Sequence, residues 1–184
     1  TVSEVTAEEC KQFLQREPDV ITINGINETY VTDENTASEK RKVAREKITE
    51  ILNILSGTKA SDDAFYILNS GRYEFKNKGI DLFINALGKL NKSAELNKEI
   101  VAVIAVPANI SGIYKELEYR REGKKPIEGH TDLPCTHHIF GYEYDAVLNS
   151  LRENGLNNNS EDKVKVMFVP SYLNGNDGVF NLKY

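Results

Sequence analysis

The chain has 184 residues, of which 40% are hydrophobic and 28% charged, and it carries a net charge of −5. This composition is typical of a folded globular protein. Acidic and basic residues are interspersed, which excludes the broad cationic surface that a nucleic-acid partner requires. No apolar run approaches the roughly 18 residues of a membrane-spanning helix, so we expect no membrane partner either.

Cysteine usage and the start of the chain bear on its compartment. The two cysteines, Cys10 and Cys135, are too few and too far apart for a disulfide framework. The chain also opens without the charged and apolar regions of a secretory signal. Both observations favour a reducing compartment, and we expect a cytoplasmic protein.

The first predicted elements are a helix over residues 6–16 and a short strand over residues 20–23. Thr6 and Glu9 have the spacing of a capping box, which makes Thr6 the expected N-cap of the helix. The strand is apolar and ends at the Asn-Gly pair of residues 24–25, a strong turn signal.

From residue 38 onwards, helices and apolar strands alternate. The predicted helices cover residues 38–55, 80–90 and 145–154, and the predicted strands cover residues 65–68, 100–106 and 164–169. Apolar strands of this kind are typical of a parallel sheet that is buried on both faces. The alternation predicts an α/β fold, a Rossmann-like parallel sheet with helices on both faces. Residues 107–135 receive no assignment.

The turn between the first strand of this series and its helix concentrates positive charge. Residues 70–79 read Ser-Gly-Arg-Tyr-Glu-Phe-Lys-Asn-Lys-Gly. A helix N-terminus attracts anions through its N–H groups and its dipole, and Arg72 and Lys78 add charge that can hold a diphosphate without a metal. The pattern alone leaves open that the cations of this turn only pair with Glu74 or Asp81 at the surface.

This turn resembles the donor-binding turn of the glycogen synthases of the animal and fungal type (glycosyltransferase family 3), which reads GRYE-x-x-NKG. Other stretches are similar to the family in the same order along the chain: residues 18–19 and 24–27, residues 136–137, residues 147–149 and residues 161–174. The last of these resembles the family's EDRVKVIFHPEFLN. Residues 107–134 have no counterpart in the family pattern.

The resemblance implies a two-domain glycosyltransferase of the GT-B type. Its reaction is the retaining transfer of glucose from a nucleoside diphosphate glucose to the non-reducing end of an α-1,4-glucan. Residues 1–28 then correspond to the end of the N-terminal domain and the hinge, and residues 29–184 to the first part of the C-terminal, nucleotide-sugar-binding domain. The chain reads as a fragment of a longer protein, and its compact form suggests a bacterial relative.

The resemblance also implies roles for individual residues. Arg72 and Lys78 are expected to neutralise the donor diphosphate, and Gly71 to allow close approach of the backbone. His137 is expected to line the nucleotide cleft and Phe168 to stack near the base, with a buried core residue as the alternative for each. The family's catalytic glutamate pair lies beyond the residues that match this chain, so we expect no catalytic residue here and no activity of the fragment alone.

No cofactor and no metal are expected. The sequence lacks an Asp-x-Asp pair, a G-x-G-x-x-G motif after a strand, and a Walker-type Gly-Lys-Ser/Thr. Cys135, His137, His138 and the upstream His130 match no structural zinc spacing. The donor substrate is therefore expected to bind without metal, as UDP-glucose or as ADP-glucose.

Two departures from the family pattern limit the prediction. The family's His-Pro-Glu after the last strand is Val169-Pro170-Ser171 here, so the roles of that His and Glu cannot be transferred. The family's long helical insertion for subunit association is far shorter here, which leaves a homo-oligomer and its regulation open. Two alternative functions also remain: a GT-B glycosyltransferase with a different acceptor, and a non-catalytic nucleotide-binding module on the same fold.

Overall fold

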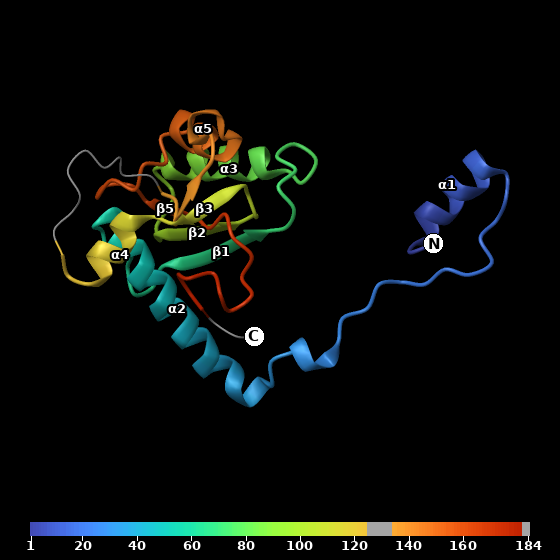
Figure 1. Ribbon diagram of the computed structural model, residues 1–184, viewed down its shortest axis with the longest axis horizontal. Helices are drawn as coiled ribbons and strands as arrows, with labels where there is room; N and C mark the ends of the chain where they lie inside the picture. The colour runs from blue at the N-terminus through green and yellow to red at the C-terminus, as the bar shows by residue number, and fades with distance from the viewer. Residues whose placement is uncertain (125–133, 182–184) are drawn as a thin grey trace. The chain divides into compact units, whose positions relative to one another are not determined.

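A computed structural model describes residues 1–124 and 134–181 of the chain. It contains two compact units, Thr1–Ser38 and Glu39–Tyr184. Among the residues described, no helix is both long enough and apolar enough to cross a membrane. Figure 1 labels the elements of both units.

The first unit contains the helix α1, Glu4–Leu14, and a 3-10 helix, Glu28–Tyr30, neither of which has a buried residue. The predicted strand at residues 20–23 is wrong, because the backbone there is irregular. Its hydrogen bonds go to a single residue: the Thr22 N–H donates to the Thr1 carbonyl at 2.8 Å. One residue is too short a partner for a strand.

The start of α1 also differs from the prediction. Ser3 is the N-cap, and its hydroxyl accepts the N–H of Thr6 at 3.2 Å. The Thr6 hydroxyl accepts the N–H of Ser3 in return, at 3.1 Å. Thr6 is therefore the third helical residue of a capping box rather than its first member, and the helix begins two residues earlier than predicted.

The long helix α2, Glu34–Ser56, begins four residues before its predicted start. The reason is Asp33, whose carboxylate accepts the N–H of Asn35 at 2.8 Å and so satisfies one of the first helical donors. Gly57 ends the helix in the left-handed conformation, with φ of 67°.

Three parallel strands form the central sheet of the second unit, in the order β1-β2-β5. They are β1, Phe65–Ser70, β2, Ile100–Ala105, and β5, Val164–Phe168. The register aligns their first residues, so that Phe65 pairs with Ile100 and Ile100 with Val164. The three carboxyl ends therefore meet at one edge of the sheet.

Helices cover both faces of this sheet, as Figure 1 shows. The helices α3, Ile80–Asn91, and α5, Ala146–Glu153, pack on one face against alternate residues of β2 and β5. On the other face, Ile51 of α2 packs against Val103 and Met167. The predicted Rossmann-like α/β fold is confirmed.

The burial of β1 differs from the prediction. All residues of β2 and β5 are buried, but Phe65 and Leu68 of β1 are each 62% exposed. The strand order places β1 at the edge of the sheet in the part of the chain that the structure describes. An edge position leaves apolar side chains accessible that a central position would bury.

Further elements lie in the segment between β2 and α5, for which no helix or strand is predicted from the sequence. The strands β3, Ile110–Ile113, and β4, His137–Ile139, form an antiparallel pair. Between them in sequence lies α4, Lys115–Arg121, whose Leu117 is buried in the core. A 3-10 helix, Tyr142–Tyr144, precedes α5. Residues 125–133 of the unassigned segment, with His130, lie outside the described residues.

Candidate functional site

A cleft of about 630 Å³ opens at the carboxyl ends of the three parallel strands. Its lining includes residues 70–73 from the end of β1, Ala105 and Pro107 from the end of β2, and residues 171–173, which follow β5. Open α/β sheets bind their ligands in this crevice, where loops from neighbouring strands converge. This is the candidate site.

Gly71 is the first residue after β1 and lies in the lining of the cleft. Its φ of 152° is unfavourable for residues with a side chain, and a Cβ built at this position would meet no atom within 4 Å. The backbone conformation, not lack of space, therefore calls for glycine here. Without a side chain, the backbone at this position is open to a ligand in the cleft.

Arg72 also lines the cleft, and its side chain is 77% exposed. Its Nε lies 3.1 Å from Oε1 of Glu74, so the surface pairing that the sequence left open is present. Exposed ion pairs contribute little to stability, because water and salt screen them. The guanidinium can therefore exchange Glu74 for an oxyanion in the cleft at small cost.

The two lysines of the turn differ in their surroundings. Lys76 forms an ion pair with Asp81, at 2.8 Å between Nζ and Oδ2. Lys78 is exposed, and its ammonium forms no ion pair with any residue in the described ranges. Lys78 does not belong to the lining of the cleft. The structure thus brings Gly71 and Arg72 together in the cleft and leaves Lys78 on the adjoining turn.

The N-terminus of α3 is already partly satisfied. The carbonyl of Phe75 accepts the N–H groups of Ile80 at 3.1 Å and Asp81 at 3.3 Å. Two of the helix donors that a phosphate would otherwise use are therefore occupied. Positive charge beside the cleft comes from side chains, chiefly from Arg72, rather than from this helix end.

Tyr73 links the turn to the start of α5. Its hydroxyl donates to Oδ2 of Asp145 at 2.6 Å and accepts the N–H of Val147 at 3.1 Å. Burial, together with the hydrogen bond to Asp145, raises the pKa of Tyr73 far above its usual range. The phenol therefore stays protonated and remains a donor to the carboxylate.

His137 is buried, with 2% of its surface exposed, and is not part of the cleft lining. Its Nε2 lies 3.0 Å from the Asp177 carbonyl and its Nδ1 lies 2.7 Å from the Thr136 hydroxyl. Burial is the main cause that lowers the pKa of His137, so the ring is neutral at pH 7. Both ring nitrogens are occupied, which is the arrangement of a core histidine.

Phe168 has no exposed surface. Its ring packs edge to face on Tyr73, with 6.3 Å between the centroids and 69° between the planes. The ring offers no free face to a base. Tyr172, by contrast, is 71% exposed and lies in the cleft lining. Sequence reasoning missed it, although its position just after the carboxyl end of the last strand is the signal that could have identified it.

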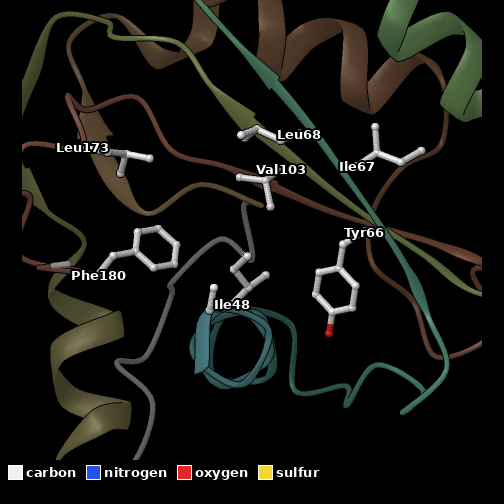
Figure 2. Close-up of a pocket in the computed structure, with 8 residues that line it drawn as sticks. Ile48, Tyr66, Ile67, Leu68, Val103, Leu173 and Phe180 are labelled. Atoms are coloured by element: carbon white, nitrogen blue, oxygen red, sulfur yellow. The ribbon is translucent and has the colours of Figure 1, made fainter. Parts of the chain in front are cut away.

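A second, smaller cavity of about 150 Å³ lies between α2 and the sheet, as Figure 2 shows. Its lining is apolar except for the Tyr66 hydroxyl, and includes Ile48, Val103 and Phe180. Such a lining offers no charge to a phosphate. Leu68 and Leu173 belong to both linings, so this cavity adjoins the cleft.

The composition of the lining bears on acid–base and metal chemistry in the cleft. Its described lining contains no aspartate and no glutamate. Within residues 1–124 and 134–181, no three side chains of His, Cys, Asp or Glu are grouped so that they could hold a metal ion. The described lining of the cleft therefore presents a cation and an exposed aromatic ring, without a carboxylate.

Comparison with known proteins shows which protein family the sequence of this chain matches. A profile described as glycogen synthase matches residues 1–117 and 128–184. The whole chain aligns at 28% identity with glycogen [starch] synthase isoform 2 of Saccharomyces cerevisiae, at 28% with the glycogen [starch] synthase of Caenorhabditis elegans, and at 25% with the liver glycogen [starch] synthase of Mus musculus. The chain covers 35%, 36% and 34% of these relatives, about a third of their length. The yeast alignment spans 247 residues, more than the 184 of this chain, so the relative carries residues that this chain lacks.

Proposed function

The chain belongs to the glycogen synthase family, and we propose that it forms the nucleotide-binding part of a retaining glucosyltransferase. The proposed reaction moves glucose from a nucleoside diphosphate glucose to the non-reducing end of an α-1,4-glucan. The observation that carries the proposal is the cleft at the carboxyl ends of the sheet, with the exposed guanidinium of Arg72 in its lining.

In this proposal the cations act on the leaving group. When the bond between the glucose carbon and the diphosphate oxygen breaks, the electron pair stays on the diphosphate and its negative charge grows. Arg72 lines the cleft, and Lys78 lies on the turn that follows. Fixed cations beside a developing oxyanion lower the barrier, because they interact more strongly with the transition state than with the bound donor. No metal is needed for this step.

The base of the donor is proposed to stack on Tyr172, the exposed aromatic residue of the lining. Base stacking on an aromatic ring tolerates any base, since every base has a π-face. UDP-glucose and ADP-glucose both fit this arrangement. In this proposal His137 and Phe168 do not contact the nucleotide. They are buried residues that support the loops around the cleft.

Catalysis is proposed to need groups outside this chain. The described lining of the cleft holds no carboxylate that could stabilise the sugar cation or activate the acceptor. We therefore expect the chain alone to bind the nucleotide weakly and to transfer no glucose. The complete protein is proposed to work in the cytoplasm on a glucan acceptor, as a monomer or as a homo-oligomer.

The proposal is tested by titrating UDP into the chain and following the heat of binding. Weak binding is expected in the unmodified chain, with no detectable binding to Arg72→Ala. Arg41→Ala is the matched control, because Arg41 is an exposed arginine on α2, outside the lining of the cleft. Equal affinity in the two variants would remove Arg72 from the site and with it the proposed role of the cleft.

A further inference from the structure

Tyr73 and Asp145 join two parts of the chain that are 72 residues apart in sequence. The hydroxyl of Tyr73 donates to one carboxylate oxygen of Asp145 at 2.6 Å. The other carboxylate oxygen accepts the N–H of Leu148 at 2.9 Å, and so caps α5. Each carboxylate oxygen thus has its own donor, which is the condition under which a buried charged group is stable.

The hydrogen bond between Tyr73 and Asp145 forms an anchor for the turn. This anchor is rigid because the hydrophobic core holds α5 in place. Asp145 is 8% exposed, and Val147, Leu148 and Leu151 on the same helix are buried against the sheet. The Tyr73 ring itself packs edge to face on Phe168 at the end of β5. A hydrogen bond to such an element fixes its partner more firmly than a bond to a mobile surface side chain would.

Tyr73 directly follows Arg72, and the two residues have opposite surroundings: the ring of Tyr73 is half-buried, whereas Arg72 is exposed in the cleft. Hydrogen bonds hold the backbone on both sides of Arg72. On one side the Gly71 N–H donates to the Ala105 carbonyl at 3.4 Å, and on the other the Glu74 N–H donates to the Arg72 carbonyl at 2.8 Å. The half-buried Tyr73 side chain, through its hydrogen bond to Asp145, completes this arrangement.

We propose that Tyr73 and Asp145 are positioning residues, which hold the turn after β1 so that the Arg72 guanidinium stays in the cleft to meet a diphosphate. This inference rests on the proposed function. A charged group pre-positioned for its ligand loses less conformational freedom on binding, so loss of the anchor weakens binding without removing any contact to the ligand. The effect is specific to the diphosphate, because the nucleoside does not use Arg72.

The test is Tyr73→Phe, which removes the hydroxyl and keeps the ring on Phe168. Affinities for UDP and for uridine are measured by NMR titration of the chain. Loss of a hydrogen bond to a charged group leads us to expect about a tenfold weaker affinity for UDP and an unchanged affinity for uridine. The matched control is Tyr66→Phe, which removes a hydroxyl that is 2.5 Å from Thr49 on the opposite face of the same sheet.

Hydrogen exchange of the backbone amides gives a readout that needs no nucleotide. In Tyr73→Phe we expect faster exchange at residues 71–79 and unchanged exchange in β2 and α3, with no such change in Tyr66→Phe. If UDP does not bind the unmodified chain but the turn exchanges faster in Tyr73→Phe, the proposed function is wrong. The role of Tyr73 and Asp145 in holding the turn is then still supported. Unchanged exchange in the turn, or parallel losses of UDP and uridine affinity, would overturn the positioning role.

Discussion

The guanidinium of Arg72 lies 3.1 Å from the carboxylate of Glu74, so the cation that lines the cleft is paired with an anion of its own turn. A bound diphosphate has to compete with that carboxylate. We predict that Glu74→Gln strengthens UDP binding by about two- to fivefold, the range expected from removal of an exposed ion pair. Calorimetric titration measures the change, and weaker binding in the variant would show that Glu74 instead orients Arg72 for its ligand.

The two lysines of the turn should contribute unequally to nucleotide binding. Lys78 is exposed and not paired with a described carboxylate, whereas Lys76 is held by Asp81 at 2.8 Å. We predict that Lys78→Ala weakens UDP binding about tenfold and that Lys76→Ala leaves it nearly unchanged. Titrations at two salt concentrations add a check, because a contact between exposed charges loses strength as salt rises. Equal losses in both variants would contradict a specific role for Lys78.

Two leucines on α3 provide a matched pair for stability. Leu87 is 1% exposed and packs in the core, whereas Leu82 on the same helix is 69% exposed. We predict that Leu87→Ala lowers the free energy of unfolding by about 2–5 kcal/mol, since it leaves a cavity. Leu82→Ala should change it by less than about 0.5 kcal/mol. Urea denaturation measures both, and similar losses would mean that α3 does not pack on the sheet as described.

The buried His137 should make stability depend on pH. Burial lowers its pKa in the folded state below the value of about 6.5 that it has when unfolded. The unfolded chain therefore takes up a proton first as the pH falls, and His137 stabilises the fold above about pH 6.5 relative to more acidic solution. The slope from this residue is at most about 1.4 kcal/mol per pH unit.

We predict that the free energy of unfolding falls between pH 7 and pH 5 and that His137→Gln makes this dependence shallower. Urea denaturation at several pH values measures it in both proteins, and the difference at pH 7 reports the cost of the lost hydrogen bonds. Parallel curves over the whole range would mean that His137 has the same pKa in the folded and in the unfolded state.

The sheet and its helices could be predicted because their signals are local. The apolar residues of α3 and α5 recur at helical spacing, β2 is apolar throughout, and Lys165 is the one charged residue in β5, so each element carries its own evidence. Burial of β1 could not be predicted in the same way. An apolar run looks alike in a central and in an edge strand, and the order of strands is a property of the whole sheet.

The elements between β2 and α5 could not be predicted from the sequence for a different reason. β3 reads Ile-Ser-Gly-Ile, a weak strand signal, and its partner β4 lies more than 20 residues further along the chain. The pairing of such segments depends on tertiary contacts that a single sequence does not reveal. The burial of Leu117 in α4 could not be predicted for the same reason. It is a single apolar residue in a charged segment, and only the folded structure shows that it packs against the sheet.

The candidate site was predictable where it follows a motif. Gly71 and Arg72 were selected from the turn sequence, and both line the cleft. Tyr172 carries no motif of its own, and its position just after the last strand is the one signal in the sequence that indicates it. The hydrogen bond between Tyr73 and Asp145 spans 72 residues, so no pattern within either segment indicates it.

The edge position of β1 has a practical consequence. Within the described part of the chain, the outer edge of this strand pairs with no other strand. Two apolar residues of the strand, Phe65 and Leu68, are exposed. Bare strand edges flanked by apolar side chains act as templates for adhesion between molecules. Concentrated samples of this polypeptide are therefore prone to cluster, and the binding measurements above call for dilute solutions whose particle size is monitored by light scattering.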